Sequence, residues 1–181
     1  MTELPDVTPE YFEILVVREL RKAGLEVTEP RVHRRTELPE PERGFLLELL
    51  VWLRRNAWQK RALIACRRQV DAIGADAINA LAPHLVEAKA EVGLLFATAA
   101  FSPEALTAGD DRGIALLQLV DARAAFDTGG WGTPGHYPAW LPAYQVQLAD
   151  RGPGGQARAR LLEAGQANII LERLQTEGGV P

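Results

Sequence analysis

An isolated acid precedes a strongly basic segment in the first half of this chain. Glu48 stands inside the apolar run FLLELLVW, residues 45–52, and a buried carboxylate is costly unless it is paired or bound to a metal. The segment between Glu48 and Asp71 contains no acid and six cations, namely Arg54, Arg55, Lys60, Arg61, Arg67 and Arg68. Because an arginine side chain presents a planar fork of donors, the segment predicts contacts with phosphate groups. The alternatives are a Glu48 that faces solvent or pairs with an arginine, and arginines that pair with nearby acids.

The other reactive residues narrow the chemistry further. The single cysteine, Cys66, has no histidine close to it in sequence, so we interpret it as a core residue rather than a nucleophile. The three histidines, His33, His84 and His136, have no spacing typical of a zinc site, and we expect His84 at the surface. A net charge of −4 argues against a generic nucleic-acid binder.

Nothing in the composition predicts a membrane protein. No apolar stretch approaches the roughly 18 residues needed to cross a bilayer, and the acidic N-terminus lacks the apolar core of a secretory signal. We therefore expect a cytoplasmic protein.

The elements that position these residues alternate between helical and extended patterns. Thr8-Pro9-Glu10 is typical of a helix start and Gly24 of a helix stop, which predicts a helix over 9–23. The two apolar runs that flank NAWQK predict a β-hairpin, because the link between them is only a few residues long. Before the hairpin, the patterns predict a short strand over 25–32 that is interrupted at Pro30. After it, they predict a helix over 75–91 that Pro83 kinks or divides, a strand over 92–98, a helix from Ser102 and a strand over 114–121. This order predicts an α/β fold with three layers and a mixed sheet.

The composition changes after residue 127. Residues 128–155 are rich in Gly, Pro and aromatic residues, and we expect a loop whose rings, Trp131, Tyr137 and Trp140, pack on the domain rather than stack on bases. Residues 156–175 have the pattern of an amphipathic helix, which we expect to pack on its own core or, hinged at RGPGG, against a second copy in a homodimer. The sequence thus predicts a domain over 8–127, a loop region over 128–155, and a C-terminal helix and tail over 156–181.

Four stretches of this sequence resemble the Mrr-like restriction endonuclease family, whose members share the PD-(D/E)xK nuclease fold. They are YFEILVVRELRKAGLEVTE at the first helix, GFLLELLVW and ALIACRRQ at the hairpin, and IGADAINALAP followed by VGLLFATAAFSPEAL. The similarity covers about residues 10–121. It implies a three-layer restriction-endonuclease-like fold with a mixed central sheet, here followed by a C-terminal helical extension. It also matches Thr98 to a family threonine, whose hydroxyl we expect to bond the backbone at a strand end.

The resemblance also gives the hairpin residues roles in phosphodiester hydrolysis. In such enzymes acidic side chains hold Mg²⁺, which polarises the phosphate and activates a water. Glu48 would stand at the metal-binding acid. Ala65 falls where the family has Glu or Gln, and Arg67 falls where it has Lys. The sequence offers two substitutes, Gln69, two residues beyond Arg67 on the same face, and Glu13 of the first helix as a metal ligand. The alternative for Glu13 is a solvated or salt-bridged residue of a surface helix.

Three functions remain open at this point. The first is a catalytically degenerate family member that acts in DNA binding or assembly, since Ala65 cannot bind a metal and arginine stays protonated. The second is a metal-dependent endodeoxyribonuclease with a rearranged site around Glu48, Arg67 and Gln69, which would need Mg²⁺. The third is a homodimeric scaffold with no nucleic-acid role.

Overall fold

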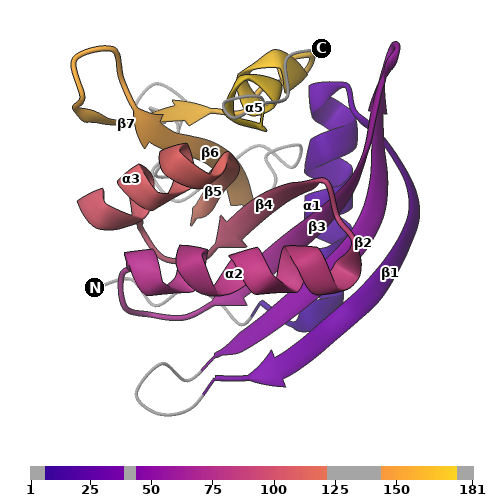
Figure 1. Ribbon diagram of the computed structural model, residues 1–181, viewed down its shortest axis with the longest axis horizontal. Helices are drawn as coiled ribbons and strands as arrows, with labels where there is room; N and C mark the ends of the chain where they lie inside the picture. The colour runs from indigo at the N-terminus through magenta and orange to yellow at the C-terminus, as the bar shows by residue number, and fades with distance from the viewer. Residues whose placement is uncertain (1–6, 39–43, 122–143, 175–181) are drawn as a thin grey trace, which may run out of the picture.

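A mixed sheet of seven strands forms the centre of the protein (Figure 1). The computed structural model describes residues 7–38, 44–121 and 144–174. The strands lie side by side in chain order as β1 (Glu26–Glu37), β2 (Phe45–Arg55), β3 (Trp58–Arg68), β4 (Val92–Ala97), β5 (Ile114–Asp121), β6 (Tyr144–Arg151) and β7 (Ala157–Leu161). The middle strands β3, β4 and β5 are parallel, and the strands on either side of them pair antiparallel. The predicted α/β fold with a mixed central sheet is therefore confirmed.

Four described helices cover the two faces of this sheet. Buried residues of α1 (Pro9–Ala23) and α5 (Ala167–Leu174) share one apolar core with the inward side chains of β2, such as Leu47 and Leu49. Buried residues of α2 (Ala75–Ala88) and α3 (Pro103–Arg112) share a second core with strand side chains that point to the opposite face, such as Leu50 of β2 and Leu63 of β3. Successive side chains of a strand point to opposite faces, so the two cores are the two sides of the sheet. We call them the α1 face and the α2 face, and they give the three predicted layers.

The first helix begins and ends where its caps predict. The Thr8 hydroxyl accepts a hydrogen bond from the Tyr11 backbone N–H at 3.1 Å, and Pro9 occupies the first turn, where no N–H is needed. Gly24 closes the helix in a left-handed conformation with φ 106°, which glycine adopts without strain. The predicted helix over 9–23 is confirmed.

Two other predictions need correction in the first 121 residues. The first strand is longer than predicted, because β1 continues past Pro30 through a bulge rather than being interrupted there. The helix after the hairpin is continuous across Pro83, so the alternative in which this residue divides it is wrong. The predicted β-hairpin is confirmed, and β2 and β3 pair along their full length.

The C-terminal region differs most from the sequence prediction. The helix predicted over 156–175 is wrong in its first part, because Ala157–Leu161 is strand β7 and only Ala167–Leu174 is helical. The loop predicted over 128–155 is wrong for 144–151, which forms β6, and RGPGG is the turn of a β6–β7 hairpin rather than a hinge. Trp131, Tyr137 and Trp140 lie outside the described residues.

The short helix α5 uses its apolar side chains within this chain. Ala167, Ile169 and Ile170 are buried in the α1-face core, which confirms the expectation that the helix packs on its own domain. Within the described residues, no helix is both long and apolar enough to span a membrane.

Candidate functional site

The β2–β3 hairpin carries the residues that the resemblance singles out. Glu48 lies directly opposite Ala65, and Leu46 lies opposite Arg67. Ala65 and Arg67 are two residues apart and so share one side of β3, Gln69 follows directly after the end of the strand, and Ala65 belongs to the α2-face core. The strands therefore bring Glu48, Ala65 and Arg67 to one face of the sheet. We call this cluster the Glu48 site.

Glu48 is completely buried, and its carboxylate contacts the side chains of His84 and Arg34. The Nδ1 of His84, on α2, hydrogen-bonds the Oε1 of Glu48, and because a carboxylate only accepts, the ring N–H donates. The Nε of Arg34, on β1, lies 3.6 Å from the Oε2 of Glu48. Arg34 also binds Glu87 of α2, with 2.7 Å between Nη2 and Oε2. Glu48 therefore pairs with an arginine, and the alternative in which it faces solvent is wrong.

His84 and Arg34 are the two members of this site that sequence reasoning missed. His84 was expected at the surface, but its side chain is only 25% exposed and reaches across to the sheet. The sequence contained one indication of them, because the isolated acid Glu48 needs a polar or charged partner when it is buried. It did not indicate which residue that partner is.

Arg67 and Gln69 are bonded to each other. The Nε of Arg67 donates to the Oε1 of Gln69 at 2.5 Å, and the Nε2 of Gln69 donates to the backbone carbonyl of Asp71 at 2.8 Å. The Thr98 hydroxyl fixes the same strand end, since it accepts from the backbone N–H of Gln69 and donates to its carbonyl. The expected local role of Thr98 is confirmed. Gln69 is buried, and both the oxygen and the nitrogen of its side-chain amide form hydrogen bonds.

Glu13 does not join the Glu48 site. It lies on α1, and the next residue of β3, Cys66, faces that helix in the α1-face core. Burial raises the pKa of the Cys66 thiol, and the negative charge of Glu13 raises it further. Cys66 is therefore a protonated core residue, as predicted. Glu13 and Glu48 approach the sheet from opposite faces.

The side chains present do not fit a magnesium ion. Among the residues that the structure describes, no three acidic, histidine or cysteine side chains are close enough together to hold a metal. At the Glu48 site the residue of β3 opposite the carboxylate offers only the methyl group of Ala65, and the Nε of Arg34 lies 3.6 Å from the Oε2 of Glu48. Arg34 thus places a positive charge beside Glu48, where a metal-dependent site has its ion, and His84 contributes a hydrogen bond.

The six cations of the hairpin segment form two separate groups. Arg54, Arg55, Lys60 and Arg61 lie near the β2–β3 turn, where Arg54 pairs with Glu26 at 3.9 Å and Lys60 with Glu91 at 3.7 Å. Arg67 lies six residues along β3 from Arg61, which is about 20 Å at the rise of an extended strand. Arg67 and Arg68 are adjacent in a strand and so point to opposite faces. The basic segment is therefore not one continuous strip.

A comparison with protein families finds a match. The Mrr_cat model, described as a restriction endonuclease, matches residues 4–124, more than half of the chain. Neither curated proteins nor solved structures give a match. The match covers every element from α1 to β5, and thus every residue of the Glu48 site.

Proposed function

The chain belongs to the Mrr_cat restriction endonuclease family, and on this premise we propose that it is a catalytically degenerate member that binds DNA without hydrolysing it. The match supports a protein with the restriction-endonuclease fold. What supports the loss of catalysis is the chemistry of the Glu48 site, described next.

The single observation that carries this proposal is the methyl group of Ala65 opposite Glu48. A metal-dependent nuclease needs several hard oxygen ligands around its ion, and alanine supplies none from its side chain. Glu48 is instead compensated by Arg34 and His84. Arg67 remains protonated at any ordinary pH, so it cannot exchange a proton with an attacking water as a lysine can.

The cations near the β2–β3 turn are the proposed DNA contacts. Arg55 is partly exposed, and among the described residues its guanidinium has no hydrogen-bond or ion-pair partner. Arg54 and Lys60 are held only by long, exposed ion pairs, which contribute little and are readily exchanged for a phosphate. Arg67 and Arg68, at the other end of β3 and on its two opposite faces, are further proposed contacts.

One observation favours the nuclease as a second candidate. The Oε2 of Glu48 is buried and accepts no hydrogen bond from the described residues, as expected for a carboxylate oxygen that binds a metal ion. Its 3.6 Å separation from the Arg34 Nε favours the degenerate site instead, since a cation already lies beside it. The scaffold that dimerises through the C-terminal helix loses its main support, because Ala167, Ile169 and Ile170 of α5 are buried within this chain.

The proposal is tested by binding of a fluorescently labelled DNA duplex at several salt concentrations, followed by anisotropy. With about four phosphate contacts, affinity falls about 100-fold between roughly 50 and 200 mM salt, because each contact releases condensed counterions. Arg55→Ala weakens binding, whereas Arg112→Ala, which removes an exposed arginine that donates to Asn79 on α2, leaves it unchanged. Failure to bind at low salt would refute a DNA-binding role.

A further inference from the structure

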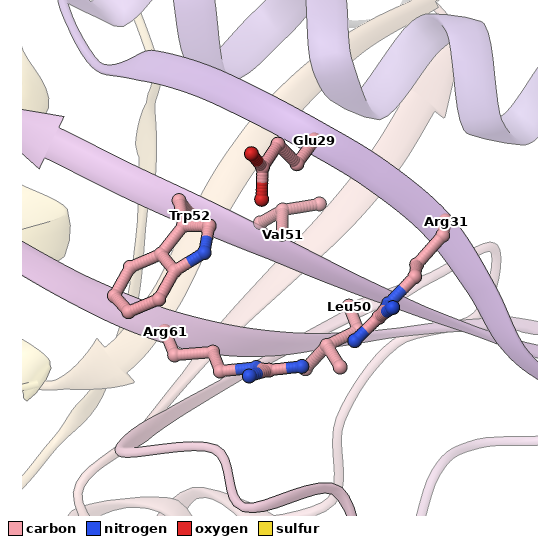
Figure 2. A pocket seen from close by; sticks show the side chains of 6 residues that line it. All are labelled: Glu29, Arg31, Leu50, Val51, Trp52 and Arg61. Carbon is pink, nitrogen blue, oxygen red and sulfur yellow. The ribbon is translucent and has the colours of Figure 1, made fainter.

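A small concave pocket lies on the α2 face, near the β2–β3 turn. Six residues of β1, β2 and β3 line it, namely Glu29, Arg31, Leu50, Val51, Trp52 and Arg61 (Figure 2). Its volume is about 110 Å³, well below the roughly 300–1,000 Å³ of pockets that enclose a drug-sized ligand. The pocket is therefore sized for one small group rather than for a whole cofactor. Glu48 does not line it and lies two residues before Leu50 on β2.

A bulge in β1 brings Arg31 to this pocket. Thr28 lies opposite Trp52, so an unbroken register would put Pro30 opposite Leu50, yet the residue found there is Arg31. The extra residue is accommodated at Glu29, whose φ of 52° is in the left-handed region that non-glycine residues rarely adopt. Because opposite residues share a face, the bulge turns the guanidinium of Arg31 toward the side of the sheet that carries Trp52 and Arg61.

Two arginine side chains whose guanidinium groups have no hydrogen-bond or ion-pair partner within the described parts of the chain line this pocket. The side chains of Arg31 and Arg61 extend toward each other from opposite sides of Leu50 (Figure 2). Neither guanidinium has a hydrogen-bond or ion-pair partner among the described residues. Two like charges that converge in this way repel each other, and an anion placed between them removes the repulsion.

The neighbouring groups hold Arg61 in place and limit the charge of the pocket. The guanidinium carbon of Arg61 lies 5.9 Å from the centre of the Trp52 ring, in a cation–π contact. Its backbone N–H donates to the Oε2 of Glu91 at 2.9 Å, which anchors the strand. The carboxylate of Glu29 lies on the Trp52 side of the pocket, so the pocket carries one net positive charge (Figure 2).

We propose that this pocket binds one phosphate group of a nucleic-acid backbone between the guanidiniums of Arg31 and Arg61. Each guanidinium fork matches the oxygens of a phosphate, and Trp52 offers an aromatic edge to the adjoining nucleotide. The inference rests on the proposed DNA-binding function and makes it specific, because it assigns one phosphate contact to a bulged strand that the basic hairpin segment does not include.

The test measures the salt dependence of DNA binding for the wild type, Arg31→Ala and a matched control, Arg35→Ala. Arg35 is an exposed arginine of the same strand that pairs with Glu10 at 3.1 Å. Loss of one phosphate contact reduces the slope of log K against log salt by about one unit, and this is expected for Arg31→Ala and not for Arg35→Ala. Glu29→Gln, which removes the negative charge of the pocket, is expected to tighten binding at low salt.

The outcomes separate this inference from the function on which it rests. If the wild type binds DNA and Arg31→Ala and Arg61→Ala keep its affinity and slope, the pocket does not hold a phosphate and the DNA-binding function stands. If the wild type does not bind DNA, both are overturned. A titration with inorganic phosphate, followed by the indole N–H resonance of Trp52, then shows whether the pocket binds the free anion instead.

Discussion

Replacing Ala65 with a carboxylate tests the geometry of the Glu48 site. Ala65 is 1% exposed and lies directly opposite Glu48. Ala65→Glu would restore an acid where the family resemblance calls for one, but next to a carboxylate that is already compensated by Arg34 and His84. Ala65→Gln introduces a side chain of nearly the same size without the charge, and it is the matched control.

The expected loss of stability has two parts. Adding a long side chain to a packed core costs about 1–3 kcal/mol, and both variants bear this cost. Opposed residues of antiparallel strands have their Cβ atoms about 5 Å apart, and two negative charges at that distance repel by about 3 kcal/mol at an effective dielectric constant of about 20. Ala65→Glu should therefore be about 3 kcal/mol less stable than Ala65→Gln at neutral pH without metal.

Urea unfolding followed by tryptophan fluorescence and circular dichroism measures this difference. The gap should narrow as the pH falls toward about 4, because the introduced carboxylate is then neutral and no longer repels Glu48. Equal unfolding free energies for the two variants at neutral pH would refute the placement of Ala65 opposite Glu48.

Two further predictions concern stability and use the same assay. Asp150→Asn should lower the unfolding free energy by about 3 kcal/mol, because it breaks a buried pair in which Arg158 donates twice, at 2.7 and 2.9 Å, and Arg160 once. Burial alone would raise the pKa of Asp150, but the Arg158 hydrogen bond and the nearby arginine charges hold it below its ordinary value, so this stabilisation is complete above about pH 4 and is lost as the pH falls further. Gly44→Ala should cost about 2–4 kcal/mol, since its Cβ would lie 1.5 Å from the backbone oxygen of Arg68 and the strands must shift apart.

Each of these stability predictions has a control within the chain. Asp110→Asn removes a more exposed partner of an arginine, Arg173, and should cost less than about 1 kcal/mol. Gly74→Ala adds a Cβ that meets nothing within 4 Å, so it should cost no more than about 1 kcal/mol. A loss as large in the control as in its paired variant would contradict the proposed cause.

Most elements of the first 121 residues were predictable because their signals are local. Thr8, Pro9 and Gly24 delimit α1 without reference to any other element, and the short link NAWQK requires the hairpin. The helix predicted over 156–175 was wrong in its first part because Ala157–Leu161 pairs with β6 as a strand. Arg158 and Arg160 are two residues apart on this strand, and both bind Asp150 of β6. A sequence that also fits a helical period does not reveal this strand pairing.

The Glu48 site was predictable only in part, for the same reason. The strand residues Glu48, Ala65 and Arg67 follow from the hairpin and the resemblance. His84 comes from α2 and Arg34 from a strand whose register depends on a bulge, so only tertiary structure brings them to Glu48. The bulge at Glu29 determines which face of the sheet Arg31 occupies, and Pro30 is the one residue in the sequence that indicates an irregularity there.

Incubation of the protein with plasmid DNA, with Mg²⁺ and separately with Mn²⁺, tests the central claim most directly. Binding is followed by gel shift and cleavage by the conversion of supercoiled to nicked or linear plasmid, for the wild type and Glu48→Ala. A degenerate site predicts a salt-sensitive shift and intact plasmid with either metal. Cleavage by the wild type that requires the metal and disappears in Glu48→Ala would contradict it.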